Sequence, residues 1–276
     1  MHKYTVLQIS SSSYINNIIM RVIAIVWCLF LKQVACYNIV AIFPTRLISH
    51  YIVFDSLMTA LVERGHNVTV YHMLPKSISK PGNYTEIRLS HCVGKGHEMG
   101  FPYPSEIMNC TPLLELRKAV GLYDALITET FINDFFSIFG YVLGIPVILV
   151  HSGNPYPYMC NHFGMSCNPS YVPVPWPHLD LGDSRRLMTF FERLQNTWIY
   201  CKAVWFYYIT CELPYNMFVR QFYNKRTPLI GAAVQNASLM LLNTHYSITG
   251  VRQLPPNVIE IGGISVKNAK PLPEVC

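Results

Sequence analysis

The sequence predicts an α/β fold, a Rossmann-like parallel sheet with helices on both faces. Short apolar runs recur along the chain, segments with helical periodicity separate them, and turn residues stand between the two. Such alternation is typical of parallel sheets, because parallel strands need long crossover connections. At 276 residues, with 51% hydrophobic and 13% charged residues, the chain has ample material for a buried core.

The first strand, helix and strand are predicted near the N-terminus. The apolar run at 37–43 lacks a helical period and ends at Pro44, which favours a buried parallel strand. From about 49 to 64 the apolar residues recur at three- and four-residue steps, and Gly65 follows where a helix C-cap is expected. The β-branched run at 67–72 predicts the second strand.

A second unit of the same kind follows a less regular stretch. Between 74 and 122 the pattern indicates loops around one weak strand and one helix. The segment 123–128 then predicts a strand, 130–143 a helix that ends at Gly144, and 145–150 another strand. Right-handed crossovers place all these strands in one parallel sheet.

The rest of the chain combines aromatic helices with further strand material. The segment 184–223 carries too many aromatic residues for a surface helix, so we expect helices packed inside the protein. The run 239–243 predicts a strand, and 254–263 leads into a segment rich in Lys and Pro. We expect one domain over 37–265 and the start of an interdomain linker at 266–276.

The N-terminal residues 1–36 are predicted to be a leader and signal peptide. A basic Arg21, an apolar run at 22–31 and the small pair Ala35 and Cys36 stand in the order of a secretory signal. That run is about half the ~20 residues of a membrane-spanning helix. An uncleaved anchor or a buried first helix is the alternative.

A chain that enters the secretory pathway can be N-glycosylated at its sequons and can form disulfides between its cysteines. The sequence predicts N-glycosylation at Asn67, Asn83, Asn109 and Asn236. Cys160 and Cys167 lie close together in a loop, where they either form a disulfide in an oxidising lumen or remain unpaired thiols.

The composition disfavours several other classes of protein. The formal charge of +6 is spread thinly, so we expect no nucleic-acid partner. The cysteines and histidines lack the spacing of zinc sites, and Gly-rich phosphate loops are missing, so we expect no metal and no tightly bound cofactor.

Several motifs in a shared order resemble the N-terminal half of animal UDP-glycosyltransferases. They are Phe43-Pro44, Ser49-His50, the "ERGHNVTV" stretch at 63–70, "YDALITE" at 123–129, "SYVP" at 170–173 with "MTFFER" at 188–193, and "LPPNV" at 254–258 with "KPLP" at 270–273. Together they extend over about residues 37 to 275.

The resemblance implies a GT-B glycosyltransferase whose N-terminal domain binds a small lipophilic acceptor. It implies a UDP-sugar, UDP-glucose or UDP-glucuronate, as co-substrate, and location in the endoplasmic reticulum lumen. We expect a fragment without the C-terminal donor-binding domain and membrane anchor, able to form a homo- or hetero-oligomer with full-length members. The alternative is a non-catalytic lumenal module that binds lipophilic ligands or a partner.

His50 is the predicted catalytic base. Transfer to a hydroxyl needs a base, and neutral imidazole serves that role near neutral pH. His50 stands at the start of the first helix, where the helix dipole disfavours an added positive charge. A helix-capping surface histidine is the alternative.

The resemblance puts Glu129 in the place of the carboxylate that supports His50, with Asp134 as the second choice. The alternative is that both residues are solvated acids at the start of a helix.

The predicted acceptor-binding residues are Ser49, His151, Phe190 and Phe191. His151 ends a strand at the edge of the sheet that faces the same crevice as His50. Phe190 and Phe191, with Trp198, Trp205 and the loop 101–104, are expected to form a lipophilic wall. Ordinary core packing is the alternative for most of these aromatic side chains.

Overall fold

The computed structural model describes residues 20–21, 36–74, 82–92, 104–174, 187–250 and 252–267. The chain divides into two compact units, 1–36 and 37–276. The predicted signal run at 22–31 and the loop positions 101–103 lie outside the described residues. Within the described part, helices that combine the length and apolarity needed to cross a bilayer do not occur.

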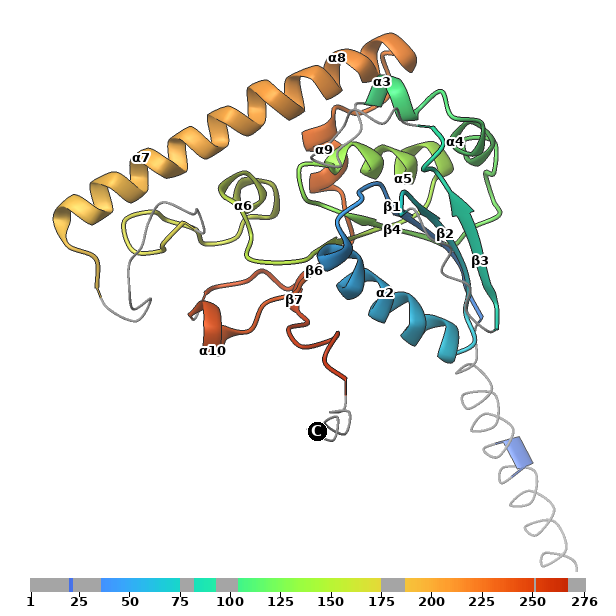
Figure 1. The fold of residues 1–276 in the computed structure, drawn as a ribbon, viewed down its shortest axis with the longest axis horizontal. Coiled ribbons are helices and arrows are strands. Elements are labelled where there is room, and N and C mark those ends of the chain that lie inside the picture. Colours follow the sequence, from blue (N-terminus) through green and yellow to red (C-terminus); the bar gives the residue numbers. More distant parts are fainter. Residues whose placement is uncertain are drawn as a thin grey trace, which may run out of the picture. The chain divides into compact units, whose positions relative to one another are not determined.

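One parallel sheet organises the second unit, as the sequence predicts (Figure 1). Its strand order is β3-β2-β1-β4-β5-β6-β7, and every neighbouring pair is parallel. The strands are β1 (Asn38–Phe43), β2 (Asn67–His72), β3 (Tyr84–Arg88), β4 (Ala125–Glu129), β5 (Val147–His151), β6 (Leu239–Leu242) and β7 (Val258–Glu260).

Helices connect these strands on both sides of the sheet. They are α2 (Ile48–Glu63), α3 (Pro104–Ile107), α4 (Thr111–Leu116), the 3₁₀ turn η1 (Asp134–Ser137), α5 (Ile138–Leu143), α6 (Pro157–Phe163), α7 (Phe190–Tyr207), the π turn η2 (Tyr208–Glu212), α8 (Leu213–Phe222), α9 (Ile230–Gln235) and α10 (Tyr246–Thr249). The elements α7, η2 and α8 follow one another without a break and form one helical run.

Alternating side chains of β1 divide the core into two clusters. Ala41 and Phe43 pack with Phe54 and Met58 of α2 on one face of the sheet. Ile42 points to the other face, into a larger cluster that holds residues of α4 to α9. This alternation follows from the two-residue period of a strand. The predicted helix layers on both faces are therefore confirmed.

Helix ends also fall where the glycines predict them. Gly65 follows α2 with φ of 87°, and Gly144 caps α5 in the left-handed conformation with φ of 69°. Glycine adopts these angles without steric cost, so each helix stops there.

The aromatic segment differs from its prediction, because α7 buries only one narrow side. Phe190, Phe191, Trp198 and Trp205 are 67%, 77%, 65% and 65% exposed, so the expectation that they pack inside is wrong. The buried side belongs instead to Asn196, Ala203 and Tyr207, which recur at steps of seven and four along the helix. Periodicity in so apolar a segment does not reveal which side faces the protein.

Disulfides fasten two loops of the second unit. Cys160 and Cys167 are joined, as one of the two sequence alternatives predicts. Cys92 and Cys110 are also joined, a pair that the sequence analysis did not predict.

Candidate functional site

The carboxyl ends of β1, β4 and β5 meet at one edge of the sheet, where they surround an open cavity of about 600 Å³. Open parallel sheets bind ligands at this edge, because the loops that leave the strands there diverge. The cavity is lined by Ser49, His50, Ile52, Val53, Phe131, His151, Ser152, Gly153, Asn154, Tyr156, Asn243 and Ser265.

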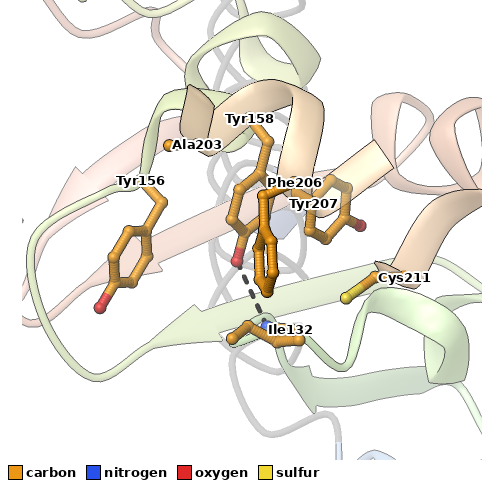
Figure 2. Close-up of a pocket in the computed structure, with 7 residues that line it drawn as sticks. All are labelled: Ile132, Tyr156, Tyr158, Ala203, Phe206, Tyr207 and Cys211. Carbon is orange, nitrogen blue, oxygen red and sulfur yellow. Dashed lines mark hydrogen bonds between the residues drawn. The ribbon is translucent and has the colours of Figure 1, made fainter. Parts of the chain in front are cut away.

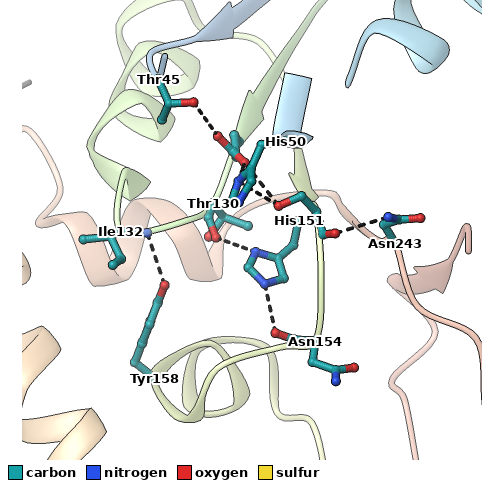
Figure 3. Close-up of polar contacts among 10 residues, drawn as sticks. Thr45, His50, Thr130, Ile132, His151, Asn154, Tyr158 and Asn243 are labelled. Carbon is teal, nitrogen blue, oxygen red and sulfur yellow. Dashed lines mark hydrogen bonds and ion pairs between the residues drawn. The ribbon is translucent and has the colours of Figure 1, made fainter. Parts of the chain in front are cut away.

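His50 lines this cavity and contacts the buried Glu129 (His50 is labelled in Figure 3). His50 lies in the first turn of α2 and Glu129 ends β4, and His50 Nδ1 lies 2.6 Å from Glu129 Oε1. Their side chains are 18% and 3% exposed. The sequence-predicted pair is thus in direct contact.

The buried carboxylate of Glu129 is held by several donors. Burial raises the pKa of Glu129 above its usual range, and the hydrogen bond from His50 is the largest effect that opposes this rise. Thr45 Oγ1 donates to Glu129 Oε2 at 3.3 Å, and Ser152 Oγ donates to Oε1 at 3.5 Å. Such donors fix the carboxylate in place.

This contact sets the tautomer of the His50 ring. Since Nδ1–H donates to Glu129, the lone pair of the neutral imidazole is on Nε2. The ring also lines the cavity. The arrangement can therefore take a proton from a hydroxyl group held in the cavity, and the carboxylate stabilises the imidazolium that results.

Ser152 and Phe131, which were not predicted from the sequence, complete the surroundings of His50. Ser152 Oγ lies 2.8 Å from His50 Nδ1, and the Phe131 ring meets the His50 ring edge-on at 4.5 Å between centroids. Each residue lies one or two positions beyond the carboxyl end of a strand. That position alone is the signal that identifies them.

His151 lies in the cavity wall at the edge that the sequence predicts. Its Nδ1 is 3.0 Å from the Thr130 carbonyl oxygen and its Nε2 is 2.9 Å from that of Asn154. These two acceptors favour the protonated ring, but burial has the larger effect and lowers the pKa of His151 to about 4. At neutral pH the His151 ring is therefore neutral, and because a neutral ring has one N–H it donates to only one of these two carbonyl oxygens at a time.

Asp134 does not contact His50, so its prediction as the second choice for the carboxylate that supports His50 is wrong. Its carboxylate accepts a hydrogen bond from Thr130 Oγ1 and another from the Tyr207 hydroxyl at 2.5 Å. Burial raises the pKa of Asp134. The alternative of solvated helix-start acids is also wrong, because both Asp134 and Glu129 are buried.

The other predicted binding residues divide between the cavity and the surface. Ser49 lines the cavity. Phe190 and Phe191 lie at the exposed start of α7 and outside the residues that line this cavity, so the structure does not bring them to His50.

Among the described residues, His91, Cys92 and Cys110 have the spacing of a metal site. Both cysteines are in a disulfide, so they supply no thiolate ligand.

Comparison with known proteins gives one family. The model described as "UDP-glucoronosyl and UDP-glucosyl transferase" matches residues 109–276. The chain is 29% identical to UDP-glycosyltransferase UGT5 of Dactylopius coccus, covering 89% of this chain and 50% of that protein. It is 33% identical to UDP-glucosyltransferase 2 of the same organism, covering 86% of this chain and 49% of that protein.

A vertebrate relative and a solved structure are also similar. UDP-glucuronosyltransferase 2B19 of Macaca fascicularis is 25% identical, covering 89% of this chain and 53% of that protein. A UDP-glucosyltransferase from Polygonum tinctorium, solved in complex with 3,4-dichloroaniline, is 13% identical over 86% of this chain and 55% of that one, with a TM-score of 0.45. The chain spans about half the length of the curated relatives it matches.

Proposed function

Since this chain belongs to the UDP-glucoronosyl and UDP-glucosyl transferase family, we propose that it forms the acceptor-binding half of a UDP-glycosyltransferase and supplies the catalytic base. The contact between His50 Nδ1 and Glu129 Oε1 at 2.6 Å carries this proposal. It leaves Nε2 of the His50 ring as the atom that can accept a proton, in the wall of a cavity large enough for a small molecule.

In the proposed reaction the acceptor hydroxyl oxygen attacks the anomeric carbon of the UDP-sugar. The new carbon–oxygen bond forms as the bond to the UDP oxygen breaks, UDP leaves with the electron pair, and the anomeric configuration inverts. His50 Nε2 takes the hydroxyl proton, and Glu129 stabilises the imidazolium. The donor is UDP-glucose or UDP-glucuronate, and the acceptor is a small lipophilic molecule.

We propose that the donor is held mainly by the part of such proteins that this chain does not span. The experiment assays a full-length protein that contains this chain, with UDP-glucose and UDP-glucuronate as donors and 4-nitrophenol as acceptor. An inverted glycoside identified by NMR supports the proposal. Absence of product with both donors and a panel of phenols and alcohols contradicts it.

A second candidate function is that of a non-catalytic module that binds lipophilic ligands or a partner. The observation in its favour is that the cavity around His50, about 600 Å³ in volume, is large enough to hold a small molecule. Tight binding of acceptors together with no sugar transfer in the full-length protein would favour this second function.

The proposed setting is the lumen of the endoplasmic reticulum, with N-glycosylation and with homo- or hetero-oligomers of full-length relatives. Two disulfides support an oxidising compartment. The sequon residues Asn67, Asn83, Asn109 and Asn236 are exposed, as glycan attachment requires. Chemical cross-linking in microsomes tests the oligomer, which the proposal expects to include a second family member.

A further inference from the structure

A cavity separate from the one around His50 lies between α5 and α9 and has a volume of about 230 Å³. We call it the amino-edge cavity. The residues that line it include Gly140, Tyr141, Pro146, Pro228, Ala233 and Asn236. A smaller cavity, between the turn after β4 and the helices α6 and α7, shares Tyr156 with the cavity around His50 and so belongs to the site already described (Figure 2).

The amino-edge cavity lies at the end of the sheet opposite His50. Pro146 directly precedes β5, and Asn236 comes three positions before β6. Because the strands are parallel, both residues are at amino ends, whereas His50 lies at the carboxyl ends. The helices α5 and α9 contact each other and both end at this edge (Figure 1). A molecule in this cavity would therefore not touch the groups of the proposed reaction.

The walls of the amino-edge cavity suit an uncharged molecule with an apolar face. Among the described residues that line it, charged side chains do not occur. The rings of Pro146 and Pro228 supply apolar surface, and the small residues Gly140 and Ala233 leave space between the two helices. Burying an ion without a partner is costly, so we expect an uncharged occupant.

Tyr141 holds an aromatic ring at the mouth of this cavity. The residue is 52% exposed, and its hydroxyl donates to the carbonyl oxygen of Arg226 at 3.3 Å. This bond fixes the ring between α5 and the segment that leads to α9. The face of an aromatic ring carries partial negative charge, which attracts the C–H groups of a sugar ring. A pyranose is therefore a suitable neighbour for Tyr141.

Asn236, the asparagine of a predicted sequon, lines the same cavity. It is the exposed C-cap residue of α9. Within the described part of the chain its side-chain amide has no hydrogen-bond partner, whereas Nδ2 of the sequon residue Asn67 donates to Asn38 Oδ1 at 2.7 Å. The amide nitrogen that would carry a glycan is thus available beside the apolar walls.

We propose that the amino-edge cavity holds the first sugar of an N-glycan on Asn236, an N-acetylglucosamine. The amide nitrogen forms a bond to the anomeric carbon of a lipid-diphosphate oligosaccharide and loses one proton, while the diphosphate leaves with the electron pair. The attached pyranose then packs on Tyr141 and the prolines and joins α5 to α9. This inference rests on the proposed lumenal setting and not on the proposed reaction.

The first test measures how fast the glycan is released from folded protein. Peptide-N-glycosidase cuts between asparagine and the first sugar and leaves aspartate, so peptide mass spectrometry of the chain from insect cells gives a rate for each sequon. Tyr141→Ala should speed release at Asn236 by about tenfold, the effect of one buried ring, and Tyr141→Phe, which keeps the ring, should not. Asn83 lies outside the residues that line the cavity and should keep its rate in both variants. Wild-type release at Asn236 in Tyr141→Ala would overturn the proposal.

The second test distinguishes a seated sugar from a general loosening by Tyr141→Ala. Ser238→Ala removes the sequon but keeps the Asn236 side chain. It should lower Tm by about 2–4 °C in the wild type, as expected for about a fivefold change in the folding equilibrium of a domain of this size, and by much less in Tyr141→Ala. Equal losses of Tm in the two backgrounds contradict the proposal.

Site occupancy separates this inference from the setting on which it rests. A protein with a glycan on Asn83 but none on Asn236 would overturn the seat in the amino-edge cavity and leave the lumenal setting intact. A protein without a glycan at any sequon would overturn both. Neither measurement needs a UDP-sugar or an acceptor, so a failure of the proposed reaction would not change the result.

Discussion

His50 and Glu129 lie 79 residues apart in the chain, yet His50 Nδ1 and Glu129 Oε1 are 2.6 Å apart in the structure. The pairing of β1 with β4 brings them together, because His50 follows β1 and Glu129 ends β4 at the same edge of the sheet. The Glu129 side chain contacts the ring directly, in the place that the family resemblance gives to the supporting carboxylate.

Glu129→Gln should lower kcat for transfer to 4-nitrophenol by about 10²- to 10⁴-fold in a full-length protein that contains this chain. The amide does not stabilise the imidazolium, and it no longer selects the Nδ1–H tautomer. Glu115→Gln, which changes an exposed carboxylate of α4, is the control and should leave kcat unchanged. A Glu129→Gln protein with wild-type kcat would exclude the carboxylate from the reaction.

Stability should depend on pH through His151. Its pKa is lowered to about 4 in the folded protein, against an ordinary value near 6.5 when unfolded, so the unfolded chain binds the proton more readily between these values. The contribution of His151 is thus complete above pH of about 6.5 and is lost as pH falls toward about 4, by roughly 3 kcal/mol.

The measurement compares the urea unfolding free energy of wild type and His151→Gln at several pH values. The difference isolates His151, because the other titrating groups are common to both proteins. Glu129 and Asp134, whose pKa values are raised, change the stability of both in the opposite direction. We expect wild type to lose more stability than the variant as pH falls from 6.5 to 4. Parallel curves would show that His151 does not titrate in this way.

Tyr207→Phe should destabilise the fold by about 1–3 kcal/mol. The change removes a hydrogen bond to the buried Asp134 and leaves one of its oxygens without that donor. Tyr208→Phe removes a hydroxyl from the neighbouring, more exposed position and should cost little. Denaturant unfolding of the two variants measures the difference, and equal stabilities would rule out the Asp134 contact as an anchor of α7.

N-glycans should cluster at the end of the sheet opposite His50. Asn67 starts β2, Asn83 precedes β3 and Asn236 precedes β6, so these three sequons lie at the amino ends of parallel strands. Expression in insect cells followed by peptide-N-glycosidase digestion should shift the mass, and each Asn→Gln change should remove one glycan. A chain that enters the lumen without glycans at these positions contradicts the prediction.

Local patterns were sufficient to predict the sheet and the placement of His50. The segments β1, α2 and β2 have clear hydrophobic periodicity, and a glycine follows the end of α2. These features place His50 at the carboxyl edge of the sheet. Glu129 was predicted from the family resemblance, and the structure places it at the end of β4. Ser152 directly follows a strand at the same edge of the sheet, so its position in the sequence could have identified it.

The parts that could not be predicted depend on distant contacts. The turn at Ile132 is held by Tyr158 and Tyr215, which come from later helices, so local sequence holds no sign that Asp134 turns away from His50. The buried side of α7 is likewise set by its contacts with α6 and with Asp134, whereas the segment is apolar nearly all round. The three-residue strand β7 is too short for a period to show.

The most direct test is the turnover of His50→Ala in a full-length protein that contains this chain, beside Ser56→Ala as a control in the same helix but outside the residues that line the cavity. Steady-state transfer from the preferred UDP-sugar to a phenol gives kcat, and titration gives the acceptor Kd. We expect His50→Ala to lose about 10²- to 10⁴-fold in kcat with little change in Kd, and Ser56→Ala to keep its rate. A His50→Ala protein with wild-type kcat would contradict the assignment of His50 as the base.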